Sequence, residues 1–183
     1  VTHFMSISQD ITDMREKELA LQYQARYDQL TGISNRFLGM EQLKQSLAKS
    51  RADLTHTVVI FLDLDNFKNI NDNLGHRTGD LILVEAAKRL KSLIRATDTL
   101  ARFGGDEFLV ILDGVARLAD AEMIVENIYQ AFLQPFSIEE NEIYVTLSSG
   151  ISVSPADGED ADELILYADS AMYHSKDRGR NTF

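Results

Sequence analysis

The 183-residue sequence has no cysteine, only two prolines and no long hydrophobic run. The absence of cysteine excludes disulfides, thiolate metal sites and cysteine nucleophiles. It also fits a reducing compartment, so we expect a cytoplasmic protein. The longest apolar run, residues 58–62, is far shorter than the ~18 residues that a transmembrane helix needs. No basic and apolar leader follows Val1, so we expect no signal peptide, no membrane contact by this segment, and a chain cut from a longer protein.

Basic residues are scarce relative to acidic ones. The chain has 18 Lys and Arg against 29 Asp and Glu, which gives a formal net charge of −11. This balance disfavours a broad basic surface, and with it nucleic acid or an anionic membrane as the main partner. We therefore expect no nucleic-acid partner, and an anionic ligand must be held by a few local cations.

The order of apolar runs predicts one α/β domain behind an N-terminal helix at residues 10–27. That helix lacks Gly and Pro and carries an imperfect coiled-coil seam; a solubilising leader helix is the alternative. Further helices are predicted at 35–52, 79–94, 118–132 and 161–176, and strands at 57–64, 99–103, 108–112 and 143–152. The Gly104-Gly105 pair predicts a hairpin turn between two of these strands. The alternation of strands and helices predicts a single sheet covered by helices.

Carboxylates gather at the ends of two predicted strands. Asp63 and Asp65 end the 57–64 strand, and Asp106 and Glu107 occupy the hairpin tip. Such remote carboxylates at adjacent strand ends are the oxygen ligands that Mg²⁺ uses when it bridges to substrate phosphates. Solvated strand-end acids are the alternative interpretation. For Asp65 we favour a helix-capping role, because a helix start can follow it directly.

The hairpin tip contains the string that names a protein family. Residues 102–108 read RFGGDEF and resemble the GGDEF signature of bacterial diguanylate cyclases. Three further segments resemble the family's motifs in the right order: YDQLTGISNR at 27–36, FLDLDNFKNINDNLGHRTGD at 61–80 and KDRGRN at 176–181. Ile33 replaces the family's usual leucine. The resemblance covers residues 27–181, which is nearly the whole predicted domain.

The resemblance implies a nucleotidyl-cyclase fold related to the polymerase palm. This is an α/β (α+β) fold with a central, antiparallel-rich mixed sheet flanked by helices. It further implies a transferase of bacterial signal transduction, a diguanylate cyclase that joins two GTP molecules into cyclic di-GMP and pyrophosphate. A homodimer and Mg²⁺ or Mn²⁺ are implied with it. Asp63, Asp106, Glu107 and the carbonyl of Leu64 would hold two metal ions, and Asp106 is also the candidate acceptor of the hydroxyl proton.

The family motifs also imply a substrate site. Asn71 and Asp80 would read the guanine, because an amide beside a carboxylate can pair with its edge. The phosphates would be held by Lys68, Lys176, Arg180 and the backbone N–H groups near Phe67. From the residues alone, Asn71 is a helix cap, Asp80 belongs to the first turn of a helix, and the lone basic residues are solvated surface.

Two further segments resemble regulatory features of the family. Arg95 and Asp98 match the RxxD site at which many members bind their own product, so allosteric product inhibition by cyclic di-GMP is implied. Residues 124–127 lack the arginine by which some members crosslink the inhibited dimer. The triplet at 10–12 resembles the end of a PAS sensor domain. We therefore divide the chain into a sensor-domain remnant and linker helix at 1–26 and a cyclase domain at 27–183.

A second function from a different class stays open. A catalytically silent module would bind GTP, or cyclic di-GMP at Arg95 and Asp98, and would control a neighbouring domain. The presence of Asp63, Asp106 and Glu107 together favours the enzyme, because a module without catalysis has no chemical need for all three acids.

Overall fold

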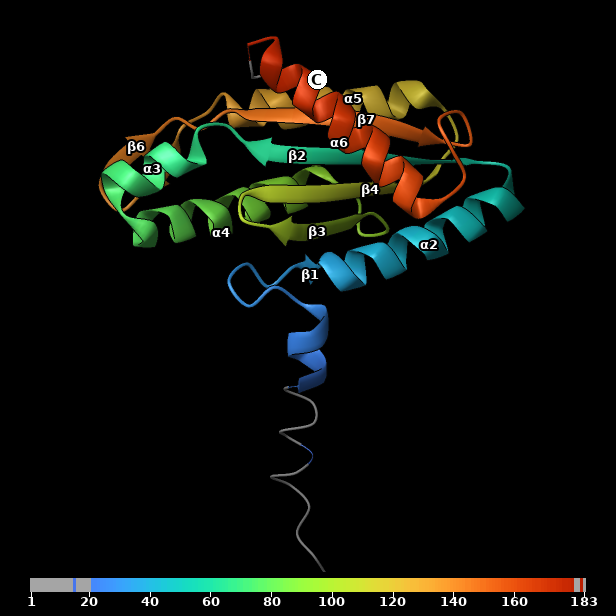
Figure 1. Cartoon of the computed structure of the whole chain (residues 1–183), viewed down its shortest axis with the longest axis horizontal. Helices are drawn as coiled ribbons and strands as arrows, with labels where there is room; N and C mark the ends of the chain where they lie inside the picture. Colours follow the sequence, from blue (N-terminus) through green and yellow to red (C-terminus); the bar gives the residue numbers. More distant parts are fainter. Residues whose placement is uncertain (1–14, 16–20, 180–181, 183) are drawn as a thin grey trace, which may run out of the picture.

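The computed structural model describes residues 15, 21–179 and 182, which form one sheet with helices on both of its faces (Figure 1). The five strands of the sheet have the order β1-β3-β4-β2-β7. They are β1 (Ser34–Asn35), β2 (His56–Leu64), β3 (Thr99–Gly104), β4 (Glu107–Val115) and β7 (Leu147–Ser154). Only the β1–β3 pair is parallel, and the three other pairs are antiparallel. The predicted fold class, a mostly antiparallel mixed sheet flanked by helices, is confirmed.

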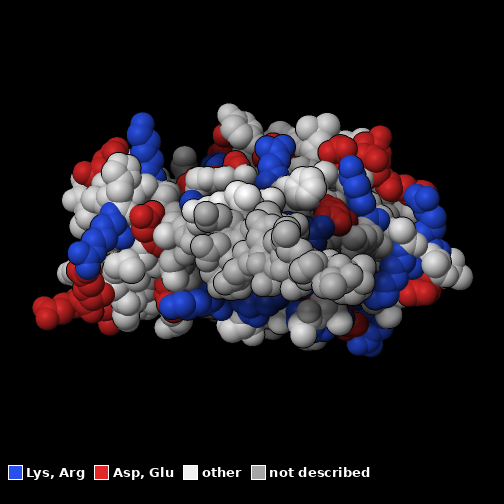
Figure 2. Space-filling view, turned by 90° about the horizontal axis from the view of Figure 1, so that it is seen from below, with Lys and Arg blue, Asp and Glu red and all other residues white. Residues whose placement is uncertain are grey.

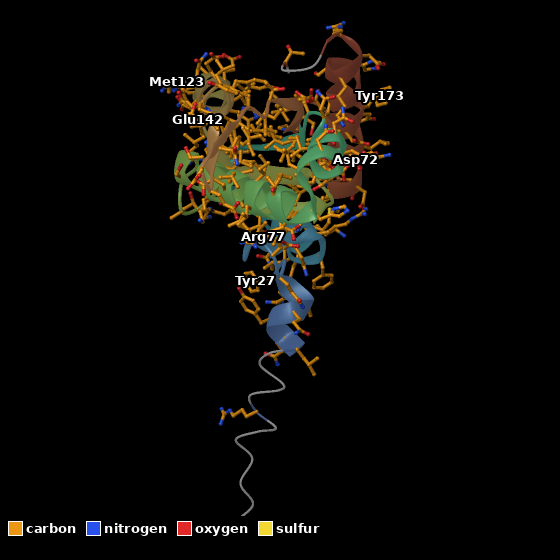
Figure 3. The ribbon with its side chains drawn as sticks, turned by 90° about the vertical axis from the view of Figure 1, so that its left-hand side faces the viewer. Tyr27, Asp72, Arg77, Met123, Glu142 and Tyr173 are labelled. Carbon is orange, nitrogen blue, oxygen red and sulfur yellow. The ribbon has the colours of Figure 1, made fainter. Side chains whose placement is uncertain are left out.

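The helices divide between the two faces of the sheet. They are α2 (Arg36–Asp53), α3 (Phe67–Leu74), α4 (His76–Leu93), α5 (Leu118–Phe132) and α6 (Ala161–Asp177). One hydrophobic cluster joins alternate residues of β2, such as Ile60 and Leu62, to α4 and α5, and the other joins Val59 and Phe61 to α2 and α6. Seen from the side, Met123 of α5 and Tyr173 of α6 lie at opposite edges of the molecule (Figure 3). The period-two alternation of the central strand therefore builds both cores.

Several elements differ from the prediction. A small hairpin of β5 (Phe136–Ile138) and β6 (Asn141–Ile143) lies outside the main sheet, and β7 begins only at Leu147. The predicted strand start at residue 143 is thus wrong, because Ile143 pairs with Phe136 and not with β2. Of the predicted linker helix, residues 15 and 21–26 are helical, and its other residues up to 20 lie outside the described part of the chain.

The surface of the described residues carries both signs of charge. On the face from which residues 21–26 project, basic and acidic side chains are interspersed (Figure 2). None of the described helices combines the length and the apolar character that a membrane span requires.

Candidate active site at the β3–β4 hairpin

The strand register brings the two acidic clusters together. Asp63, near the end of β2, lies directly opposite Glu107, the first residue of β4. Asp106 stands in the turn between β3 and β4, and its backbone carbonyl accepts a hydrogen bond from the backbone N–H of Leu64 at 3.3 Å. Carboxylates more than 40 positions apart in sequence thus share one edge of the sheet. The β2–β4 pairing fixes their positions.

The turn that carries Asp106 is held by an arginine. Gly105 has φ +50°, which favours glycine. Arg102 donates two hydrogen bonds to the carbonyl of Gly105, at 3.0 and 2.7 Å, and two to the carboxylate of Asp28, both at 3.1 Å. Burial alone would raise the pKa of Asp28, but the hydrogen bonds from Thr31 and Arg102 lower it below its usual value. The loop after residues 21–26 is therefore coupled to the hairpin turn through one half-buried ion pair.

The acidic residues repel one another electrostatically in this structure. Burial, with the charges of Asp106 and Glu107, raises the pKa of Asp63 to about 6, although the ammonium group of Lys176 lies 2.7 Å from its carboxylate. Burial also raises the pKa of Asp106, and burial with the charges of Asp169 and Asp106 raises that of Glu107. The site therefore concentrates negative charge that a bound cation would stabilise.

The donor set fits a hard divalent cation that arrives with a nucleotide. A pocket of about 230 Å³ is lined by Asp63, Leu64, Asp65, Asn66, Phe67, Lys68, Asn69, Asp106 and Lys176. Within the described ranges, no three His, Cys, Asp or Glu side chains converge on one metal position. Mg²⁺ needs no such cage, because it is usually bound by one or two carboxylates together with substrate phosphates and water. Asp63 and Asp106, beside Lys68 and Lys176, can therefore hold a metal and a phosphate chain together.

Asp65 has a structural role, but not the predicted one. Its carboxylate is buried and accepts hydrogen bonds from Thr146 Oγ1 and Ser148 Oγ, both at 2.7 Å. The N-cap of α3 is Asn66, whose side chain makes no capping hydrogen bond. The prediction that Asp65 caps this helix is therefore wrong. Asp65 instead fastens the end of β2 to β7 and the loop before it.

The proposed guanine and phosphate residues lie on α3, α4 and α6. Asn71 is half-buried within α3 and is not a helix cap, and Asp80 is exposed just beyond the first turn of α4. Figure 3 views this end of the molecule, with Asp72 of α3 and Arg77 of α4 labelled. Lys68 is exposed beside the pocket, and Phe67 is buried beneath it. Arg180 lies outside the described residues.

Arg95 and Asp98 form a compact pair away from the hairpin tip. The Asp98 side chain has no exposed surface and accepts from the Arg95 guanidinium at 3.0 and 2.9 Å. It also accepts from the backbone N–H groups of Arg95 at 2.9 Å and Asp113 at 3.2 Å. The side chain of Arg95 is 52% exposed. Asp98 therefore positions Arg95, and only Arg95 presents a large open surface to a ligand.

Three residues near the site were missed by sequence reasoning. The Arg36 guanidinium lies 5.4 Å from the centre of the Phe103 ring, and its charge acts on Glu107. Arg36 and Arg102 both lie inside the motifs quoted above, so their place in those motifs could have identified them. Asp169 of α6 also acts on Glu107, but nothing in its sequence context marks it.

We expect the Asp63→Asn variant to be more stable than the wild type at pH 8 and equally stable near pH 4. The pKa of Asp63 is raised from 3.8 to about 6, so the folded protein binds a proton between these values and the unfolded chain does not. Stability therefore falls as the pH rises through this window, and an asparagine avoids the cost of about 1–3 kcal/mol. Urea unfolding of both proteins in EDTA measures the difference. A variant that is less stable at pH 8 would contradict it.

Comparison with known proteins agrees with the geometry. The family model described as "Diguanylate cyclase, GGDEF domain" matches residues 25–182. The chain belongs to the GGDEF family. One GGDEF relative, the bifunctional diguanylate cyclase/cyclic di-GMP phosphodiesterase MucR of Pseudomonas aeruginosa, is 42% identical over 159 residues, which are 87% of this chain and 23% of MucR. The diguanylate cyclase TpbB of the same species is 35% identical over 170 residues, which are 92% of this chain and 39% of TpbB.

Solved GGDEF structures share the fold. The GGDEF domain of TpbB superimposes with a TM-score of 0.80 at 36% identity, over 82% of this chain and 94% of that one. The coiled coil and GGDEF domain of DgcB from Caulobacter crescentus, in complex with c-di-GMP, gives a TM-score of 0.81 at 27% identity, over 94% and 92%. The chain spans between a fifth and two fifths of the length of the curated relatives named above.

Proposed function

We propose that this GGDEF domain is an active diguanylate cyclase that joins two GTP molecules into cyclic di-GMP. The observation that carries the proposal is the pairing of Asp63 with Glu107 across two strands, beside Asp106 and the two lysines of one pocket. Membership of the family supports it. The proposal covers this domain, and the activities of the longer relatives are not transferred with it.

Each side chain has a role in the proposed reaction. Asp63, Asp106, Glu107 and the Leu64 carbonyl would hold Mg²⁺ or Mn²⁺, which when bound lowers the pKa of the attacking hydroxyl and neutralises the leaving group. The 3′-oxygen of one GTP forms a bond to the α-phosphorus of the other, the bond to pyrophosphate breaks, and Asp106 accepts the hydroxyl proton. The phosphates are bound by Lys68, Lys176, Arg180 and the backbone N–H groups near Phe67.

Guanine recognition is assigned to Asn71 and Asp80. The exposed carboxylate of Asp80 can accept from two N–H donors of guanine, and the Asn71 amide beside it can donate and accept. Adenine offers a different pattern and would leave these groups unpaired. Neither residue contributes to the pocket of acids and lysines, so base recognition and metal binding are separable.

The reaction needs two copies of the domain. Each copy holds one GTP, and a twofold arrangement lets each 3′-hydroxyl reach the α-phosphate of the other GTP. We therefore propose a catalytic homodimer and a role for residues 1–26 in its assembly. We also propose that cyclic di-GMP binds at Arg95 and inhibits the enzyme; the structure of the DgcB GGDEF domain in complex with c-di-GMP supports this ligand.

The deciding experiment is incubation of the purified chain with GTP and Mg²⁺, with the products identified by mass spectrometry. We expect cyclic di-GMP and pyrophosphate, and a specific activity that falls on dilution because the active form is a dimer. Nucleotide binding without any product, at every protein concentration and with Mn²⁺ as well, would contradict the enzyme. That result would favour the alternative, a silent regulatory module.

A further inference from the structure

The turn between α3 and α4 places one asparagine against one glycine. The two helices are joined at a single residue, Gly75, whose φ of +84° favours glycine. Asn71 lies four residues before this corner and Gly79 four residues after it, so each stands one helical turn away. Backbone hydrogen bonds from Gly75 N–H to Asn71 and from Gly79 N–H to Gly75, at 2.9 and 3.3 Å, close the corner. The last turn of α3 and the first turn of α4 thus meet at Gly75.

Gly79 has no room for a side chain. A β-carbon at this position would overlap Asn71 Oδ1, would lie 3.0 Å from Asn71 Cγ and would lie 3.2 Å from Phe67 Cζ. The Phe67 ring is buried in the core, so it cannot move freely. The Asn71 carboxamide is the free end of a half-buried side chain and can rotate away. A methyl group on residue 79 would therefore displace the carboxamide, and at Phe67 it would require a shift of only a few tenths of an ångström.

We infer that Gly79 is a positioning residue for base specificity, because its missing side chain lets the Asn71 carboxamide lie against α4. This inference rests on the proposed function, which assigns guanine recognition to Asn71 and Asp80. Asp80 directly follows Gly79 in α4, so the glycine sets the amide against the helical turn that also carries Asp80. The smallest substitution at residue 79 changes the orientation of one recognition group without touching the acids or lysines of the pocket.

The test uses nucleotides that bind but cannot be joined. The probes 3′-deoxy-GTP and 3′-deoxy-ATP lack the attacking hydroxyl, so their affinities are independent of catalysis. We expect the wild type to bind 3′-deoxy-GTP more tightly than 3′-deoxy-ATP. In the Gly79→Ala variant the ratio of the two affinities should be about tenfold smaller, which corresponds to one well-formed hydrogen bond. The Gly158→Ala variant is the matched control, because its β-carbon would lie 3.3 Å from the carboxylate end of Glu163 and make ordinary contacts with Glu163 Cβ and Leu164 Cδ2 at 3.7 and 3.9 Å.

A double-variant cycle identifies Asn71 as the group through which Gly79 acts. In an Asn71→Ala background, the Gly79→Ala change should not alter the preference further. An unchanged preference in Gly79→Ala, an equal loss of both nucleotides, or a further effect in the Asn71→Ala background would overturn the inference. So would a wild type that does not prefer guanine.

Folding is controlled in the same cycle. Alanine is a better helix former than glycine, so the melting temperature of Gly79→Ala should not fall. If the melting temperature falls and the double variant restores it, the clash with Asn71 is the cause. If the fall persists in the double variant, the contact with Phe67 is the cause and the inference is overturned. A wild type that prefers guanine but makes no cyclic di-GMP would remove the proposed function and leave this inference intact.

Discussion

The Glu107→Gln variant should form cyclic di-GMP at least on the order of 10²–10³-fold more slowly than the wild type, because it loses one of the charges proposed to hold the metal. Glutamine keeps the shape of the side chain. It also removes a charge that burial and two neighbouring acids already disfavour, so the fold should not suffer. Initial rates with GTP and Mg²⁺, measured with the melting temperature of the same sample, separate a chemical defect from a structural one.

Asp169→Asn provides the matched control for this variant. Asp169 lies on α6 and its charge acts on Glu107, so the substitution removes the same charge from the same neighbourhood. It is not a proposed ligand, and we expect its rate to stay within a few-fold of the wild type. Near-normal turnover in Glu107→Gln, or an equal defect in Asp169→Asn, would show that Glu107 contributes only to the general negative potential.

The sequence was sufficient to predict the meeting of the acids but not their surroundings. Asp63 ends a strand whose period-two pattern is plain, and Glu107 follows a double-glycine turn, so both ends of the contact carry local signals. The register that sets Asp63 opposite Glu107 depends on packing of the whole sheet. Local patterns thus predicted that these acids meet, and tertiary structure determined the geometry of their contact.

The errors arose where a partner lies far away in the sequence. Asp65 looks like a helix cap from its neighbours, yet it bonds to Thr146 and Ser148, which are 81 and 83 residues away. Asp98 was predicted as part of the RxxD site, but its hydrogen bond from the backbone N–H of Asp113, 15 residues on, has no local signal. A buried carboxylate must find donors wherever the fold supplies them, and a local pattern contains no record of those donors.

A short motif can also occur more than once. The pattern RxxD is met by Arg77 and Asp80 and by Arg117 and Asp120, as well as by Arg95 and Asp98. Arg77 forms its ion pair with Glu139 instead. The two other matches are ion pairs between residues three apart, but the Asp120 side chain is 41% exposed and the Asp98 side chain is fully buried. The structure also separates these two pairs, because burial of Asp98 fixes Arg95 in one orientation. Arg117 is therefore the natural control for an experiment on Arg95.

The Arg95→Ala variant should bind cyclic di-GMP about 100-fold more weakly than the wild type, which corresponds to ~2.7 kcal/mol and is within the range found when an arginine at a binding interface is truncated to alanine. The guanidinium is half-exposed and already oriented by Asp98, so little conformational entropy is lost when it meets a guanine or phosphate group. Isothermal titration of wild type, Arg95→Ala and Arg117→Ala with the dinucleotide measures the effect. Product inhibition should be relieved in Arg95→Ala alone.

The fold of this variant should survive because of the geometry around Asp98. When the guanidinium is removed, the backbone N–H groups of residues 95 and 113 still donate to the two oxygens of Asp98, one to each. The stability loss should therefore stay at ~1 kcal/mol, whereas Asp98→Ala would remove the acceptor of both part-buried donors and cost more. Equal affinity of wild type and Arg95→Ala would refute the proposed product site. An equal loss of affinity in Arg117→Ala would show that the dinucleotide responds only to positive surface charge, because that variant removes a similar exposed arginine from a similar ion pair.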